Sequence, residues 1–214
     1  MDFIVYLPIL FFSIILHEYA HGYAAYRCGD DTAYLMGRLT FNPIKHVDLA
    51  GTIIVPFICY LLHIPMFGWA KPVPVNYYRL GNPRKDMAKV AFAGPASNLF
   101  LVLAAVVILK IIIAANLANG AGAKVAEILV YAIMINLLLA IFNLIPIPPL
   151  DGSKILSGIL PQQAAYKYMR LERYGMLIVI VLIVSGVFSK IVLPLFYIPL
   201  NIIFSFLGVS NVQF

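Results

Sequence analysis

His17-Glu18-Tyr19-Ala20-His21 lies inside the first hydrophobic run of the chain, residues 3–25. Two histidines four positions apart share one face of a helix, where they can hold a divalent metal ion, and the glutamate beside the first can serve a metal-bound water. The alternative is that the two imidazoles only form hydrogen bonds within a helix bundle. Three ionisable groups would then lie in an apolar helix at a high cost in free energy, because no metal ion would compensate for their burial. The stretch therefore predicts a helix that carries a metal site within a membrane.

The composition of the chain indicates that its solvent is the lipid bilayer. Of the 214 residues, 63% are hydrophobic and 11% are charged, and the mean hydropathy is +0.95. This length favours one membrane-embedded domain over residues 1–214, with a core at about 3–160 and C-terminal helices at 176–208. The net charge of +6 comes largely from basic residues in short loops, which is typical of membrane topology. Cys28 and Cys59 form no CxxC pair and are expected to be free thiols.

The apolar runs give the expected fold class. They occur at about 3–25, 49–67, 88–115, 125–150 and 176–208. A helix needs roughly 20 residues to cross the hydrocarbon core, so the first, third and fourth runs each provide one span. The last run is one tilted span or two short ones, with a break expected near 189–194 because Lys190 and Pro194 interrupt it. We therefore expect an all-α polytopic membrane protein, a bundle of about five to six transmembrane helices.

The run 49–67 does not fit a straight lipid-facing helix, because it contains two prolines, a glycine and His63. Basic residues flank it on both sides, in 26–48 and in 68–89. The positive-inside rule places both flanks in the cytoplasm, which a re-entrant hairpin allows and a single crossing does not. We expect such a hairpin between the first and second core helices. A short sheet-like segment should accompany it, because the Pro-rich stretch 71–75 cannot be helical.

Asp151 is the outstanding candidate for a third metal ligand. A catalytic zinc site usually takes three protein ligands and leaves a fourth position for water. Three prolines precede Asp151 and end the fourth apolar run, and Gly152 after it permits a close backbone approach. If 49–67 is re-entrant, two crossings separate His21 from Asp151, and both finish on the cytoplasmic side. The alternative for Asp151 is an acid at a helix end in an interfacial turn.

Several motifs together resemble one family. His17, Glu18 and His21 match an HExxH motif, and Asn143, Pro146, Asp151 and Gly152 match Asn-x-x-Pro-x-x-x-x-Asp-Gly without a gap. The stretch Ala93 to Asn98 resembles a Gly-Pro-x-x-Asn signature on the intervening core helix. With these motifs the chain is similar to the site-2 proteases, the intramembrane zinc metallopeptidases, and specifically to the compact bacterial type without a PDZ domain. The similarity covers about residues 10–160.

The resemblance implies a function and a set of roles. The chain would be a zinc metalloendopeptidase that hydrolyses peptide bonds in or near transmembrane segments of membrane proteins. One Zn²⁺ per chain would be bound by His17, His21 and Asp151, and Glu18 would act as general base and then as proton donor. Such a protein would be a multi-pass protein of the bacterial inner membrane, the cell membrane, with its active site toward the cytoplasm. Its expected partners are a transmembrane protein substrate and the lipid bilayer, with no nucleic acid or nucleotide. An oligomer is not predicted, and the oligomeric state is left open.

Three further residues are candidates for supporting the substrate backbone or the oxyanion: Asn143, Asn98 and His46. Each has a structural alternative. Buried amides need partners, so Asn98 and Asn143 also fit hydrogen bonds between helices or to carbonyls freed by nearby prolines. His46 also fits an interfacial loop, and His63 is interpreted as structural.

Two other classes of protein compete with this interpretation. A membrane metal-ion transporter also places histidine and acidic residues in membrane helices, but it commonly carries ligands along a path and shows inverted repeats. This chain has one ligand cluster, one distant aspartate and no repeat. A catalytically inactive homologue that only binds would not need Glu18.

Overall fold

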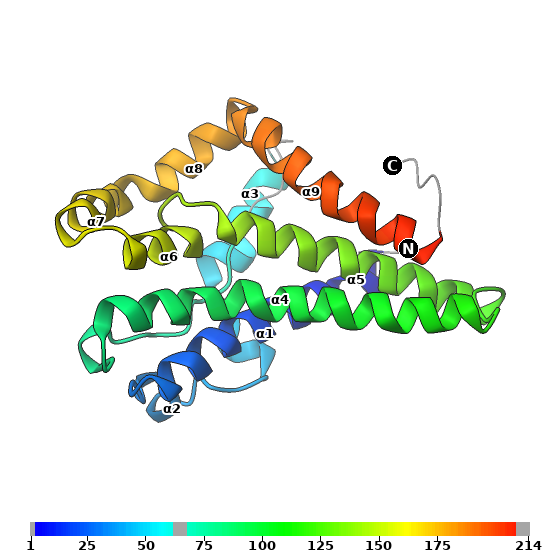
Figure 1. The fold of residues 1–214 in the computed structure, drawn as a ribbon, viewed down its shortest axis with the longest axis horizontal. Helices are drawn as coiled ribbons and strands as arrows, with labels where there is room; N and C mark the ends of the chain where they lie inside the picture. Colours follow the sequence, from blue (N-terminus) through cyan, green and yellow to red (C-terminus); the bar gives the residue numbers. More distant parts are fainter. Residues whose placement is uncertain (1–2, 62–67, 209–214) are drawn as a thin grey trace.

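Three long helices form the centre of the molecule in the computed structural model, which describes residues 3–61 and 68–208. These helices are α1 (Phe3–Arg27), α4 (Pro83–Ala114) and α5 (Ala121–Leu144). Figure 1 shows α4 and α5 side by side along the long axis of the molecule, with α1 packed against α4. Since α5 runs back along α4, its end returns to the part of the bundle that contains the second half of α1.

The shorter elements surround this centre. They are α2 (Thr32–Leu35), η1 (Pro43–His46), η2 (Leu49–Ile54), α3 (Val55–Leu61), η3 (Tyr77–Arg79), α6 (Asp151–Ile159), α7 (Gln162–Met169), η4 (Arg170–Tyr174), α8 (Gly175–Val184) and α9 (Val187–Leu207). All the regular structure among the described residues is helical, so the predicted all-α class is confirmed there. Cys28 and Cys59 are both free, as predicted.

Three of the described helices are long and apolar enough to cross a membrane: Pro83–Ala114, Gly122–Leu144 and Val187–Leu207. Because most of their side chains are not buried inside the molecule, lipid is the environment that suits them. The further spans expected from the sequence, including the first run, stay predictions.

The break in the last apolar run lies earlier than predicted. We expected it near 189–194, but α8 ends at Val184 and α9 begins at Val187, with Pro194 and Pro199 inside α9. The reason is Gly186, whose φ of 72° is the left-handed conformation that ends a helix and that glycine adopts without strain. A proline inside a membrane helix is tolerated when neighbouring groups satisfy the freed carbonyl.

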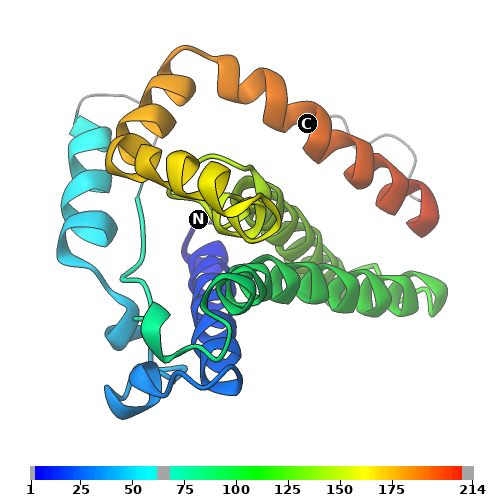
Figure 2. The ribbon, with the colours of Figure 1, turned by 60° about the vertical axis from the view of Figure 1, so that its left-hand side comes forward.

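The start of the run 49–67 lies next to Trp69, which follows the run in the sequence. The amide of Trp69 donates to the carbonyl of Gly51 at 3.1 Å, and the hydroxyl of Thr52 donates to the carbonyl of Trp69 at 3.0 Å. The Trp69 indole also covers the Gly51 backbone so closely that a Cβ there would lie 2.4 Å from the ring. In Figure 2, α3 stands to one side of the central bundle. Residues 62–67, including His63, lie outside the described residues, and the re-entrant hairpin stays a prediction.

The expected sheet-like segment is not confirmed, since no strand occurs among the described residues. The stretch 71–76 is an irregular chain outside any helix. Pro72 and Pro74 have no backbone N–H to donate to a ladder. The amide of Lys71 donates to a backbone carbonyl, and the amides of Val73 and Asn76 donate to side chains.

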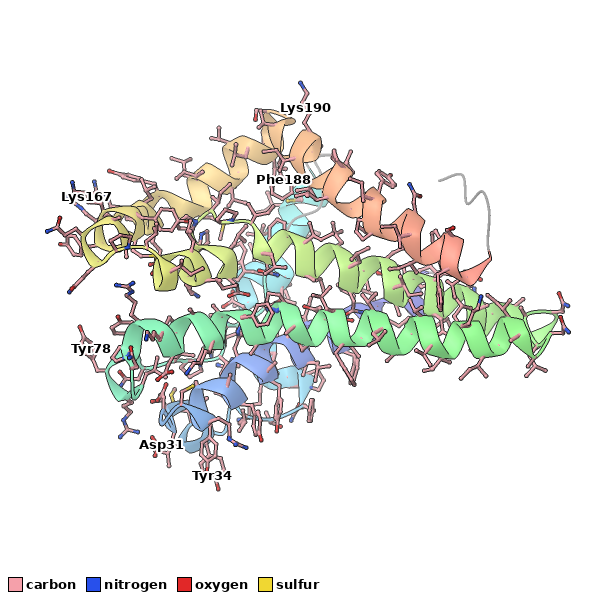
Figure 3. All side chains as sticks on the ribbon, viewed as in Figure 1. Asp31, Tyr34, Tyr78, Lys167, Phe188 and Lys190 are labelled. Atoms are coloured by element: carbon pink, nitrogen blue, oxygen red, sulfur yellow. The ribbon has the colours of Figure 1, made fainter. Side chains whose placement is uncertain are left out.

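The polar loops gather at one end of the molecule. Figure 3 places Tyr78, on η3, and Lys167, on α7, at the same end, whereas Lys190 lies near the start of α9, away from that end. The sequence predicts that the loops with Lys167 and with Tyr78 face the cytoplasm. Their common position agrees with that expectation, although the orientation itself stays a prediction.

A hydrophobic core joins α9 to α4 and α5. Its buried members are Val102, Ala105, Val106, Leu109, Ile133, Leu137, Phe196, Leu200, Phe204 and Leu207. In a membrane such contacts act through close packing, because lipid tails are as apolar as the side chains themselves.

Leu200→Ala should therefore lower the stability of the protein through the cavity it leaves. The Leu200 side chain is 0% exposed, and truncating a leucine at a packed site costs about 2–5 kcal/mol. Thermal unfolding in detergent should show a melting temperature several degrees lower. Ile202→Ala is the matched control, since Ile202 is 65% exposed on the same helix. Equal losses in the two variants would contradict this packing of α9.

Candidate metal centre

Three potential ligand atoms face one another between α1 and the start of α6. His17 Nε2 and His21 Nε2 are 3.0 Å apart, and each lies 3.2 Å from Asp151 Oδ2. His17 and Asp151 are buried. The sequence predicted Asp151 as the candidate third ligand, and the structure brings it to the two histidines.

The hydrogen bonds on the far side of each ring fix which nitrogen carries the proton. His17 Nδ1 lies 2.6 Å from Asn98 Oδ1, and His21 Nδ1 lies 2.7 Å from the carbonyl oxygen of Val90. Both partners are acceptors, so each neutral imidazole carries its proton on Nδ1. The two Nε2 atoms therefore present lone pairs toward each other and toward Asp151.

This arrangement fits a metal ion. Three lone pairs within 3.2 Å repel one another unless a cation lies among them, and the buried Asp151 Oδ2 accepts no hydrogen bond among the described residues. Tetrahedral zinc with ligands about 2.0–2.2 Å away keeps its ligand atoms roughly 3.3–3.6 Å apart. The observed triangle is only slightly tighter, so small side-chain movements adapt it to zinc.

A positive charge among the three atoms favours the ionised form of Asp151. When the imidazoles of His17 and His21 carry that charge as protons and donate to Asp151, they outweigh the effect of burial and hold the pKa of its carboxyl group well below its usual range. A metal ion in the same place favours the carboxylate in the same way.

Two glycines allow the backbone to approach the site. A Cβ on Gly94 of α4 would lie 2.4 Å from His21 Nε2 and 2.6 Å from His17 Nε2. A Cβ on Gly152 would lie 2.2 Å from the carbonyl oxygen of Leu144, where α5 ends. The close approach predicted at Gly152 is therefore present, and Gly94 gives the imidazoles their space.

A chain of buried polar side chains supports His17 from behind. Asn98 Nδ2 donates to Asn136 Oδ1 at 2.9 Å, and Asn136 Nδ2 donates to Ser13 Oγ at 2.9 Å. Ser13 Oγ in turn donates to the carbonyl of Ile9. These bonds link α1, α4 and α5, and they orient the Asn98 amide so that its oxygen faces His17.

Glu18 lies beside the ligand atoms. A carboxylate oxygen of Glu18 and one nitrogen from each of His17 and His21 lie within 4.8 Å of one another. Glu18 Oε2 accepts a hydrogen bond of 2.8 Å from the backbone amide of Val73. Val73 stands between two prolines, so its amide is the single donor in that tripeptide.

The segment 71–76 is held in place by loop residues. Arg38 donates to the carbonyls of Lys71 and Pro72, at 2.9 and 3.2 Å. The Lys71 amide donates to the carbonyl of His46, and the Asn76 amide donates to the buried carboxylate of Asp30. These bonds fix the backbone that presents the Val73 amide to Glu18.

The remaining predicted residues occupy different places. Asn143 lines a cavity at the ligand atoms, which we call the metal-site cavity. This cavity has a volume of about 390 Å³, and its walls also include His17, Glu18, His21 and Asp151. Asn98 is fully buried behind His17 and does not line this cavity. His46 is buried in η1, where its Nε2 bonds to the carbonyl of Thr40. The supporting roles of these three residues stay predictions.

Sequence reasoning missed Ser13, Asn136 and Arg38. Ser13 and Asn136 gave a signal, a polar side chain inside an apolar run, since buried polar groups need partners. Arg38 lies in the polar segment 26–48 and gave no such signal. Without the fold, however, nothing indicated which partner each would have.

The fold and the site define a class: a helical protein with apolar helices suited to a membrane, an HExxH glutamate and three clustered candidate metal ligands, a pattern typical of metallopeptidases. Residues 107–186 match the model of Peptidase family M50. The chain is 38% identical over 206 residues to "Putative zinc metalloprotease YwhC" of Bacillus subtilis, covering 91% of each chain. It is 29% identical over 200 residues to the similarly named Rip2 of Mycolicibacterium smegmatis, covering 93% of this chain and 72% of that one. No solved structure matches.

The chain belongs to peptidase family M50. The family predicted from the two metal motifs is thereby confirmed.

Asn98→Leu should weaken zinc binding by about 10–100-fold, the usual effect of removing the partner of a ligating histidine. The substitution leaves the buried Nδ1–H of His17 without an acceptor. A chelator competition titration on the purified protein measures this affinity. Asn201→Leu, at an exposed position of α9, should bind zinc as the wild type does. Unchanged affinity in Asn98→Leu would show that the amide does not position His17.

Proposed function

We propose that this chain is an intramembrane zinc metalloprotease, which hydrolyses peptide bonds in or near transmembrane segments of membrane proteins. The observation that carries the proposal is the set of facing lone pairs on His17, His21 and Asp151, with Glu18 beside them in an apolar helix bundle. The family and the names of the relatives support it.

The residues divide the chemistry among them. His17, His21 and Asp151 hold one zinc ion, which when bound activates water and polarises a carbonyl group. Glu18 accepts a proton from the attacking water and passes it to the leaving nitrogen. The Val73 amide holds Glu18 Oε2 and leaves the other carboxylate oxygen for this proton.

The surroundings of the site suit a substrate that comes from the membrane. A second cavity of about 240 Å³ shares His17, Glu18 and Asn143 with the metal-site cavity, and its other walls include Trp69, Phe142, Met176 and Val179. Its apolar walls fit the side chains of a transmembrane segment. Asn143 lines both cavities, and its Nδ2 donates to the carbonyl of Leu139 at 3.0 Å. Its second N–H is the donor that would support the substrate backbone or the oxyanion.

The placement in the cell follows from the same proposal. We place the protein in the cell membrane as a multi-pass protein, with five to six spans that include α1 and with the re-entrant hairpin after it. The loops with Tyr78 and Lys167 and the active site then face the cytoplasm. The substrate is a transmembrane protein.

The competing classes are not favoured. A transporter would distribute ligands along a path, but the described residues hold their metal-binding groups at a single place. A homologue that only binds would not need a carboxylate held beside the ligands.

Glu18→Gln should abolish proteolysis while leaving zinc bound. Loss of a general base lowers the rate by about 10²–10⁴-fold, whereas the three ligands are untouched. The assay measures cleavage of a single-span reporter in liposomes, together with the zinc content of the protein. Glu127→Gln, an exposed position of α5, is the control. Retained cleavage in Glu18→Gln would refute the mechanism, and zinc transport without cleavage by the wild type would favour the transporter.

Arg38→Met should lower kcat roughly tenfold without loss of zinc, a smaller effect than removal of the base itself. The change frees the carbonyls of Lys71 and Pro72 and so loosens the backbone that holds Glu18. Kinetics on the same reporter and metal analysis measure the two quantities. Arg27→Met removes an exposed arginine at the end of α1 and should have wild-type kinetics. A kcat equal to that of the wild type in Arg38→Met would rule out this support.

A further inference from the structure

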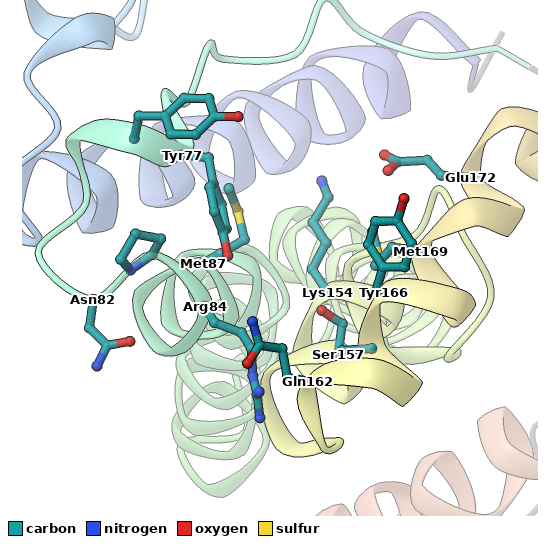
Figure 4. Close-up of a pocket in the computed structure, with 13 residues that line it drawn as sticks. Tyr77, Asn82, Arg84, Met87, Lys154, Ser157, Gln162, Tyr166, Met169 and Glu172 are labelled. Carbon is teal, nitrogen blue, oxygen red and sulfur yellow. The ribbon is translucent and has the colours of Figure 1, made fainter.

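A cavity of about 820 Å³ adjoins the metal site, and we call it the vestibule. Tyr77, Arg84, Tyr166 and Glu172 are among its walls (Figure 4). Met87 and Lys154 line both the vestibule and the metal-site cavity, so the two cavities adjoin at these side chains. Its volume is within the range of about 300–1,000 Å³ typical of ligand sites.

Lys154 is the cation at the junction of the two cavities. It lies three residues after Asp151 on α6, so one helical turn separates it from the metal ligand. Its side chain is half-buried and extends into the vestibule (Figure 4). Among the described residues, no ion pair or hydrogen bond of its ammonium group is found. Arg84, by contrast, already donates to the carbonyls of Gly158 and Leu160.

The vestibule also has the surface that a peptide requires. Three tyrosines (Tyr77, Tyr78 and Tyr166) and two methionines offer apolar contact area, and Tyr hydroxyls and the Lys154 ammonium offer donors. A substrate that reaches the metal site must continue beyond it on both sides of the scissile bond. The vestibule adjoins the metal-site cavity, and Tyr78, which lies at the end of the molecule where the polar loops gather (Figure 3), is one of its walls.

We propose that the vestibule binds the substrate segment that flanks the scissile bond, and that Lys154 selects an acidic side chain in this segment. The inference rests on the proposed function. An aspartate or glutamate placed there pairs with a half-buried ammonium group, whereas a lysine placed there meets a like charge. The kcat/KM for a substrate with an acidic residue should be roughly tenfold higher than for one with a lysine at the same position, which is about the effect of one charge-assisted hydrogen bond.

The test uses the full-length protein and a set of single-span reporters in liposomes. Each reporter carries Asp, Asn or Lys at one position flanking the scissile bond, and kcat/KM is measured for each. At one or two positions, the wild type should cleave the Asp reporter roughly tenfold faster than the Lys reporter. Lys154→Glu should reverse this order, and Lys154→Gln should remove the preference.

Lys167→Glu is the matched control, because it makes the same charge change on α7 at a residue that does not line the vestibule. It should keep the wild-type order. The Asp-to-Lys ratio is measured within each variant, so it reports selectivity even if the Lys154 variants bind less zinc or are less stable.

The outcomes separate the two proposals. Cleavage of all reporters with the same ratio in the wild type and in Lys154→Glu would overturn the selectivity of Lys154 and leave the protease proposal intact. If Lys167→Glu also reversed the order of the Asp and Lys reporters, the selectivity of Lys154 would again be overturned, because the effect would then come from the overall charge of the protein. Absence of cleavage by the zinc-loaded wild type on every reporter would overturn both.

Discussion

The structure depends on one electrostatic constraint: three lone-pair atoms, two imidazole nitrogens and a carboxylate oxygen, face one another within 3.2 Å in a buried place. In a site of low dielectric constant, the free energy of these three facing atoms is high when no cation is present and low when a cation lies among them. Each ligand therefore has to be held by groups that prevent it from turning away. Asn98 and the Val90 carbonyl hold the two rings, and the helix α6 that starts at Asp151 holds the carboxylate.

The helix arrangement follows from this requirement. The helix that contains the HExxH motif cannot also contain Asp151, which lies far along the chain. The chain therefore runs away from the motif in α4 and returns to it in α5. The buried amides of Asn98 and Asn136 are satisfied by one another and by Ser13, which couples the three long helices to the orientation of His17. Polar bonds between helices matter in a membrane, where apolar packing against lipid gives little preference for one partner.

The sequence predicted the family, the helical class and the meeting of Asp151 with His17 and His21, because short motifs with fixed spacing carry that information. It did not predict the partners of Asn136 or Arg38, since these depend on residues 33–123 positions away in the chain. The helix break at Gly186 was also missed. The prolines of the last run suggested a later break, but one glycine in a left-handed conformation has a stronger effect than a proline within a membrane helix.

The most direct test of the central claim is X-ray absorption spectroscopy at the zinc edge of the purified, zinc-loaded protein. We predict a four-coordinate ion with only nitrogen and oxygen neighbours at about 2.0–2.2 Å, and the outer-shell scattering of two imidazole rings. The Asp151→Asn variant should change this spectrum. A sulfur neighbour at about 2.3 Å, a single imidazole, or a spectrum unaffected by the change at Asp151 would contradict the site described here.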